Sequence, residues 1–259
     1  MIEPEIAAAA LIQARLDYSV LETFPGGAFP ADLAEGYAVL DSIVAQFGIA
    51  VGGWKVALTN DVAMKRMNTD RPAAGPIFQP YIMASPKLLN LPSESSLGLE
   101  CEFAFRMGGT LPSRQEPFTS EEVLGMAESL HPAIEVVDSR IAGRADHGAP
   151  AVIADHCGNA AFVHGEGTTD WRGLDLATQK VTLTVNGEHT ASGSGGEVLG
   201  DPRNSLVWLA NFLSVQGKGL KAGDWVTTGS TMGICPAPPG SVSVADFGSL
   251  GRVEVSFTD

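Results

Sequence analysis

The segment LECEFAFRM, residues 99–107, carries the pattern that decides the fold, because charged and apolar side chains alternate along it. Successive side chains of a β-strand point to opposite faces of the sheet. Glu100 and Glu102 therefore share one face, while the cysteine, the phenylalanines and the methionine of the segment pack on the other. The pattern predicts a strand over residues 98–107 that presents two carboxylates to one space.

Two glutamates on the same face of a strand repel each other unless positive charge lies between them. A hard divalent cation with oxygen ligands meets that need. The alternative is an exposed strand face with two solvated glutamates. The E-x-E pattern is common in proteins and does not by itself decide between these two interpretations.

A third carboxylate occurs in PAIEVVD, residues 132–138, where Glu135 interrupts an apolar strand pattern. A buried carboxylate without a partner is costly, so Glu135 needs a cation or a hydrogen-bond donor. Three carboxylates suit magnesium or manganese and not zinc, which prefers His and Cys. Asp138 and Arg140 follow directly. They could form a structural ion pair or orient the metal ligands, and the pattern leaves both open.

Lys55 is the remaining candidate for chemistry, within the strand pattern GGWKVALT of residues 52–59. Alternation places it on the face opposite Trp54 and Val56. It could be an edge-strand lysine whose ammonium reaches water. Alternatively it binds a substrate carboxylate or exchanges protons, with a pKa lowered by burial.

Length and composition favour one large folded domain over residues 1–259, with a helical annex over residues 1–50 and a β-rich core from about residue 51. Apolar residues make up 44% and charged residues 18%, which argues for a folded chain and against a disordered one. The net charge of −14 and the lack of a basic stripe argue against nucleic-acid binding. An anionic substrate would need local positive charge from a metal or from a few Lys and Arg residues.

The chain is expected to be cytoplasmic. Its three cysteines form no CxxC pair, so neither a disulfide framework nor a zinc knuckle is indicated. Glu3 and Glu5 occupy the region where a signal peptide carries positive charge. No run reaches the ~20 apolar residues of a membrane span.

Local signals place most of the other elements. Helices are expected over residues 4–19 and 30–47, each with a proline in its first turn, and a turn-rich stretch follows the strand of Lys55. A Thr119/Glu122 capping box predicts a helix that ends near residues 131–132, and Asp201 begins another. An Asn-Gly pair joins two strands within VTLTVNGEHT, whereas SGSGGEVLG lacks dinucleotide-loop spacing and is expected to be a hairpin loop. The segments WVTTGS and RVEVSF are typical of closing strands.

Seven segments in order resemble the 2-keto-4-pentenoate hydratase and 4-oxalocrotonate decarboxylase family of the fumarylacetoacetate hydrolase superfamily. They are GWKVALT, LECEFAF, PAIEVVDSRI, VIADHCGNAAFVHG, VLGDPRNSLVWLANFL, LKAGDWVTTGSTMG and GRVEVSF. The resemblance implies an α+β fold with a mixed β-roll or sandwich core and N-terminal helices. It also implies an oligomeric enzyme with bound magnesium, or manganese as the alternative.

The resemblance also implies roles for individual residues. The metal ligands would be Glu100, Glu102 and Glu135, and Lys55 would be catalytic. Ser230 belongs to a TGS turn similar to a substrate-contacting turn of the superfamily. Asp138, Arg140 and His156 are further candidates for substrate contact or for orienting the ligands.

Two departures from the family pattern bear on the reaction. Pro72-Ala73-Ala74-Gly75 replaces a PDFG-like loop, so a carboxylate that assists proton transfer is missing, and Asp70 is close only in sequence. Residues 154–158 read ADHCG where the family has an ADNAS-like segment. Metal binding is therefore the firmer expectation and the reaction the less determined one.

The expected activity is hydration of a 2-hydroxy-dienoate or 2-oxo-enoate by a lyase of aromatic catabolism. Decarboxylation of a 2-oxo-enedioate is the alternative, followed by C–C hydrolysis of an acylpyruvate. Other possibilities are a catalytically weakened partner subunit and, from a different class, a calcium-binding β-sandwich lectin. The expected partners are a small carboxylic acid, further copies of the chain, and a decarboxylase or aldolase of the same pathway, with neither nucleic acid nor membrane.

Overall fold

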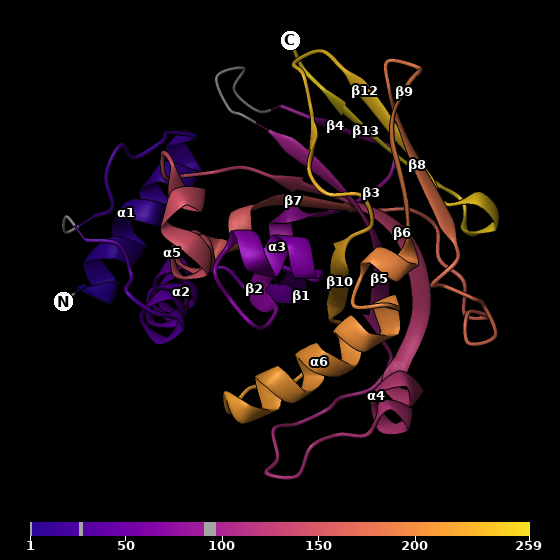
Figure 1. Cartoon of the computed structure of the whole chain (residues 1–259), viewed down its shortest axis with the longest axis horizontal. Coiled ribbons are helices and arrows are strands. Elements are labelled where there is room, and N and C mark those ends of the chain that lie inside the picture. Colours follow the sequence, from indigo (N-terminus) through magenta and orange to yellow (C-terminus); the bar gives the residue numbers. More distant parts are fainter. Residues whose placement is uncertain (1, 26–27, 91–96) are drawn as a thin grey trace.

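The computed structural model of the chain describes residues 2–25, 28–90 and 97–259, and within these ranges two β-sheets form (Figure 1). The larger sheet has the order β2-β1-β10-β5-β6-β7-β3, with β11 paired to β5. Its strands are β1 (Val51–Ala57), β2 (Ala73–Phe78), β3 (Ile82–Ala84), β5 (Gly98–Met107), β6 (Ala127–Val137), β7 (Asn159–His164), β10 (Trp225–Ser230) and β11 (Cys235–Pro236). No helix of the described residues is long and apolar enough to cross a bilayer.

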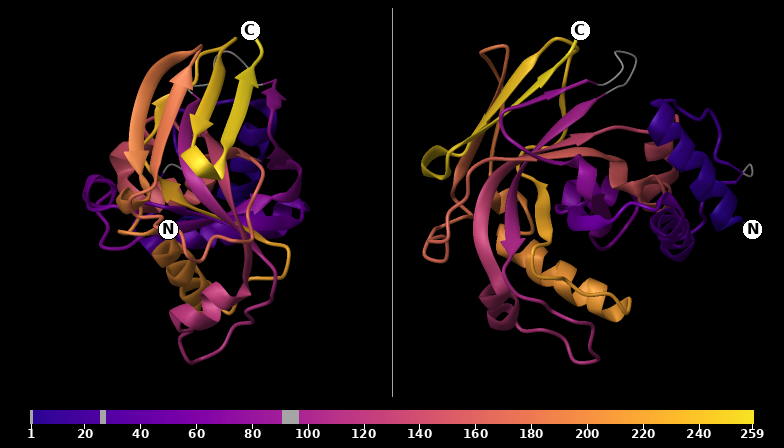
Figure 2. Two further views of the ribbon diagram at one scale, coloured as in Figure 1. Left: turned by 90° about the vertical axis from the view of Figure 1, so that its right-hand side faces the viewer. Right: turned by 180° about the vertical axis from the view of Figure 1, so that it is seen from behind.

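The smaller sheet stands at the opposite end of the molecule from the N-terminal helices (Figure 2). Its order is β4-β13-β12-β8-β9. The strands are β4 (Lys87–Leu89), β8 (Lys180–Val185), β9 (Glu188–Ser194), β12 (Val242–Asp246) and β13 (Arg252–Phe257). Asn186 and Gly187, both at positive φ, form the predicted turn between β8 and β9.

The main core fills the space between the two sheets, and it decides which face of β5 is polar. Cys101, Phe103 and Phe105 are buried in this core. Phe103 meets Phe247 edge-on, with ring centroids 5.3 Å apart. Because side chains alternate, Glu100 and Glu102 point away from this core, as the sequence predicts.

Helices pack against both terminal and interior strands of the larger sheet, with α5 against β2, α6 against β10 and α4 against β6. They are α1 (Pro4–Asp17), α2 (Leu33–Phe47), α3 (Asp61–Arg66), α4 (Ser120–Met126), α5 (Gly148–Ala154) and α6 (Pro202–Val215), with 3-10 turns at Gln79–Tyr81, Arg144–His147, His156–Gly158, Gly195–Glu197 and Gly248–Leu250. Apolar residues of α1 and α2 share a second core with Phe78 of β2 and Ala154 of α5. The expected Thr119/Glu122 capping box and the Asp201 cap are both present.

Several local expectations were wrong. The helix after Thr119 ends at Met126, and the residues up to Val137 form β6, because they pair along the whole of β5. The α2 helix begins after Asp32, which caps it, so Pro30 precedes the helix. Residues 192–200 finish β9 and enter a 3-10 turn instead of forming a hairpin loop. Helices α3 and α5 were not anticipated.

Candidate metal centre

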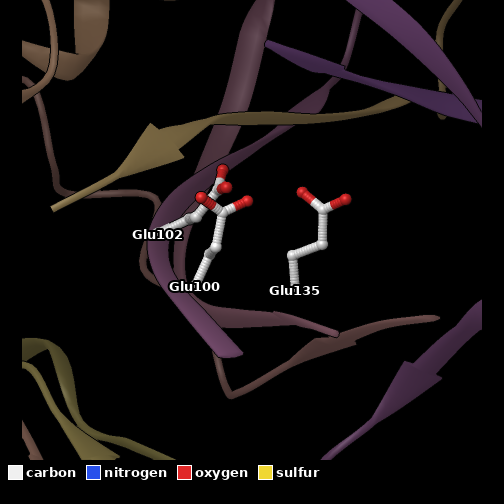
Figure 3. A group of neighbouring side chains, drawn as sticks. All are labelled: Glu100, Glu102 and Glu135. Carbon is white, nitrogen blue, oxygen red and sulfur yellow. The ribbon is translucent and has the colours of Figure 1, made fainter. Parts of the chain in front are cut away.

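Three glutamates from two adjacent strands converge on one point (Figure 3). Glu100 and Glu102 lie on β5, and the antiparallel register pairs Glu100 with Glu135 of β6. One carboxylate oxygen from each of the three lies within 4.8 Å of the others. Glu102 and Glu135 are fully buried, whereas the Glu100 side chain is 16% exposed. The strand register therefore builds a buried, oxygen-only cluster.

The hydrogen bonds of this cluster leave two buried oxygens without a partner. Glu102 Oε2 accepts from the Gly229 amide at 2.7 Å, and Glu135 Oε1 accepts from Asn159 Nδ2 at 3.0 Å. Glu102 Oε1 and Glu135 Oε2 have no donor among the described residues. A buried charged acceptor without a partner costs at least about 1–3 kcal/mol. A hard divalent cation would satisfy both oxygens, so the residues present fit such an ion.

Electrostatics support the same conclusion. Burial, together with the neighbouring Glu135 and Glu100, raises the pKa of Glu102 well above its ordinary value. Burial also raises the pKa of Glu135, and Lys55 only partly opposes this. The protein therefore holds carboxylates where they are poorly stabilised as anions, which is the arrangement expected of a site that a cation completes.

Lys55 lies inside this cluster and not at a sheet edge. Strand β1 runs between β2 and β10, and Lys55 is 1% exposed. Its ammonium is 3.1 Å from Glu135 Oε1 and 3.6 Å from Glu100 Oε2. Burial alone would lower the pKa of Lys55, but the Glu135, Glu100 and Glu102 carboxylates raise it above its usual range. The expected lowering of this pKa was therefore wrong, because the neighbouring carboxylates outweigh the effect of burial.

The third partner of Lys55 is a main-chain carbonyl in a left-handed turn. Lys55 Nζ donates to Cys157 O at 3.1 Å. The backbone has positive φ at three consecutive residues, His156, Cys157 and Gly158. Such conformations are unfavourable for residues with a Cβ, and they tend to cluster at functional sites. The turn thus uses a strained backbone to direct one carbonyl at the lysine.

His156 and Arg140 hold this turn in place. Neither lines the cavity that lies beside the carboxylate cluster. The ring Nε2 of His156 hydrogen-bonds to the carbonyl oxygen of Pro76. Arg140 pairs with Asp155 at 2.7 Å, and not with Asp138 as one interpretation of the sequence had it. The carboxylate of Asp138 instead accepts from the Ser139 amide.

A cavity of about 1130 Å³ adjoins the carboxylate cluster. Lys55, Glu100 and Ser230 of the TGS turn lie in its wall. Helix α3 and the turn Gly195–Glu197 contribute further wall residues. The space is large enough for a small organic acid beside the cluster.

The structure does not supply the missing carboxylate near Ala73 and Ala74. Both alanines are buried in β2, where they pair with Ala57 and Val56. Asp70 forms an exposed ion pair with Arg71 at 2.7 Å and does not line the cavity. Among the described residues, the other acidic side chains of the cavity wall are those of Asp61 and Glu197.

Gly229 gives a test of how the main chain supports Glu102. Its φ is +109°, and a Cβ there would lie 2.2 Å from Thr59 Oγ1. We expect Gly229→Ala to displace the amide that donates to Glu102, weaken divalent-cation binding, and lower the free energy of unfolding by about 1–3 kcal/mol. Calorimetric cation titration and denaturant unfolding measure both effects.

Gly187→Ala is the matched control, because Gly187 also has positive φ but nothing lies within 4 Å of its added Cβ. It should cost backbone strain and leave cation affinity unchanged. Equal cation affinity in Gly229→Ala and the native protein would show that the amide does not position Glu102.

Residues 50–258 match the family model described as "Fumarylacetoacetate (FAA) hydrolase C-terminal". The chain belongs to this family. Among curated fumarylacetoacetate hydrolase relatives, the 2-keto-4-pentenoate hydratase of Paraburkholderia xenovorans strain LB400 is 31% identical, covering 91% of this chain and 86% of that protein. The 4-oxalocrotonate decarboxylase of Pseudomonas sp. strain CF600 is 27% identical, covering 81% of this chain and 78% of that protein.

A solved structure shows the same fold. The 4-oxalocrotonate decarboxylase from Pseudomonas putida G7, complexed with magnesium and adipate, has a TM-score of 0.85 to this chain at 24% identity, over 99% of both chains. The expected α+β fold of the fumarylacetoacetate hydrolase type is therefore confirmed.

Three supports of this site escaped the sequence analysis: the Asn159 amide, the Gly229 N–H and the Cys157 carbonyl. The last two are main-chain groups, which residue type does not reveal. Asn159 could have been noticed as a polar residue at the start of an apolar strand. Arg15 of α1 and Arg140 both donate to the Asn159 carbonyl, so the N-terminal helix also braces this part of the site.

Proposed function

We propose that this chain is a magnesium-dependent lyase that adds water to a 2-hydroxy-dienoate or 2-oxo-enoate, within aromatic catabolism. The observation that carries the proposal is the buried cluster of three carboxylates with a lysine ammonium against Glu100 and Glu135, beside a cavity of small-molecule size. The name of the 31% identical hydratase supports the same reaction.

In this proposal Glu100, Glu102 and Glu135 hold magnesium, with manganese as the alternative. When bound, the metal supplies a Lewis acid for the 2-oxo and carboxylate oxygens of the substrate. Lys55 carries a proton at Nζ, orients the substrate carboxylate and donates that proton during the reaction. Ser230 contacts the substrate from the cavity wall. Asp138, Arg140 and His156 support the site from outside the cavity.

Decarboxylation of a 2-oxo-enedioate is the second candidate. The relative from Pseudomonas sp. strain CF600 bears the name of such an enzyme, and the same metal would stabilise the electron pair left when carbon dioxide departs. Hydrolysis of a C–C bond in an acylpyruvate is less favoured, because that branch of the superfamily normally needs an acid/base dyad, which the described residues of the cavity wall do not supply. We also propose a cytoplasmic homo-oligomer in which residues 1–259 form one catalytic domain.

Turnover of two dienoates tests the assignment. We expect magnesium-dependent loss of the ultraviolet absorbance of 2-hydroxypenta-2,4-dienoate or 2-hydroxymuconate, and no loss in excess chelator. Mass spectrometry of the product distinguishes the reactions, since hydration adds one water and decarboxylation removes carbon dioxide. Loss of neither substrate, while magnesium and oxalate still bind, would overturn the enzyme assignment and favour the partner-subunit interpretation.

A further inference from the structure

The cavity beside the carboxylate cluster contains positive charge that the metal site does not use. Among the described residues of its wall, the basic side chains are those of Lys55, Arg66 and Arg144. Lys55 already contacts two carboxylates of the metal cluster and the Cys157 carbonyl. Arg66 is exposed on α3. Arg144 is different, because its side chain is only 14% exposed and still lines the cavity.

Arg144 carries donors and charge that its surroundings leave free. It shares Asp155 with Arg140, so one carboxylate faces two guanidinium groups. Arg140 uses all three of its nitrogens, donating to Asp155 and to the Asn159 carbonyl. Only Nη1 of Arg144 donates to a described side chain, that of Asp155. Its Nε and Nη2 donate to no described residue. The two guanidinium groups together carry one positive charge more than Asp155 balances.

Gly158 fixes the place of this guanidinium. A Cβ at residue 158 would lie 2.5 Å from Arg144 Nη2 and 3.2 Å from Cζ, so the guanidinium rests on the bare glycine backbone. The neighbouring residue, Cys157, offers its carbonyl to Lys55. Arg144 is therefore held on the same short turn that reaches the metal cluster, and it lines the same cavity as Lys55 and Glu100.

We propose that Arg144 binds a second carboxylate of the substrate, so that the preferred substrate is a dicarboxylate 2-oxo acid. A guanidinium with a free N–H pair binds a carboxylate through two parallel hydrogen bonds. The first carboxylate and the 2-oxo group of the substrate lie at the glutamate cluster. The second carboxylate, at the other end of the substrate, reaches Arg144. This specificity role rests on the proposed function, because it places the reacting end of the substrate at the metal site.

Binding of two matched ligands tests the role without requiring turnover. 2-Oxoadipate and 2-oxohexanoate have the same carbon chain and differ only in the terminal carboxylate. With magnesium present, we expect the native protein to bind 2-oxoadipate about 10- to 100-fold more tightly, which is the range for one charge-assisted pair. In Arg144→Met the two affinities should become equal through loss of 2-oxoadipate affinity alone. Isothermal titration calorimetry measures both.

The controls separate this role from the fold and from the reaction. Unchanged 2-oxohexanoate binding shows that Arg144→Met has folded, and Arg66→Met should retain the preference because that arginine is exposed. Arg144→Lys should give an intermediate preference. Equal affinities in the native protein, or equal losses of both ligands in Arg144→Met, would overturn the proposal. If the dienoates are not turned over but the preference for 2-oxoadipate persists and depends on Arg144, the proposed reaction fails and the dicarboxylate site stands.

Discussion

Lys55→Met should abolish turnover while leaving magnesium binding in place. The methionine side chain is similar in length and removes only the ammonium and its three polar contacts. The three glutamates remain, so the metal keeps its ligands and loses only a competing positive charge. We expect kcat to fall by about 10²- to 10⁴-fold, the usual contribution of a positioned proton donor. Steady-state kinetics and calorimetric magnesium titration measure the two effects.

Lys218→Met is the matched control for this experiment. Lys218 pairs at 2.5 Å with Asp41, both side chains are partly exposed, and Lys218 does not line the cavity beside the carboxylate cluster. Its loss should change neither turnover nor magnesium affinity. If magnesium affinity fell together with turnover in Lys55→Met, the lysine would act by assembling the site, and a direct role in catalysis would be contradicted.

Glu102→Gln should be more stable than the native protein without magnesium and less stable with it. Glutamine keeps an oxygen that can accept from Gly229 but removes the buried negative charge. Burial and two neighbouring glutamates raise the pKa of Glu102, so its ionised form destabilises the fold near neutral pH. In chelator, the variant should therefore melt at a higher temperature than the native protein. In magnesium the order should reverse, because the native protein gains binding energy that the variant has lost.

The loss of magnesium affinity in Glu102→Gln should be large. Changes to groups that only orient a ligand typically reduce metal affinity by about 10- to 100-fold, and removal of a ligand charge should exceed that range. Thermal denaturation with and without magnesium gives the reversal, and titration gives the affinity. Glu254→Gln, on an exposed position of β13, should behave like the native protein under both conditions. A magnesium-dependent rise in melting temperature that survives in Glu102→Gln would exclude Glu102 as a ligand.

Much of the local structure follows from sequence periodicity. Alternation in residues 98–107 gives the bounds of β5 and its polar face, the Asn-Gly pair gives the β8–β9 turn, and Asp201 begins α6. These features depend on neighbours in the chain, so a short window contains the necessary information. The end of α4 and the start of β6 could not be read in this way, because pairing with β5 outweighs the local helical signal.

The sequence by itself determined which residue types could form the site: three glutamates and one lysine on strands with alternating faces. Only the tertiary structure decided how they act. The β5–β6 register brings Glu135 beside Glu100, and the central place of β1 turns a lysine that could have reached water into a buried ammonium. Asp155 rather than Asp138 became the partner of Arg140, which left Arg144 with free donors. Charge and pKa depend on burial and on partners distant in the chain, and a one-dimensional pattern contains neither.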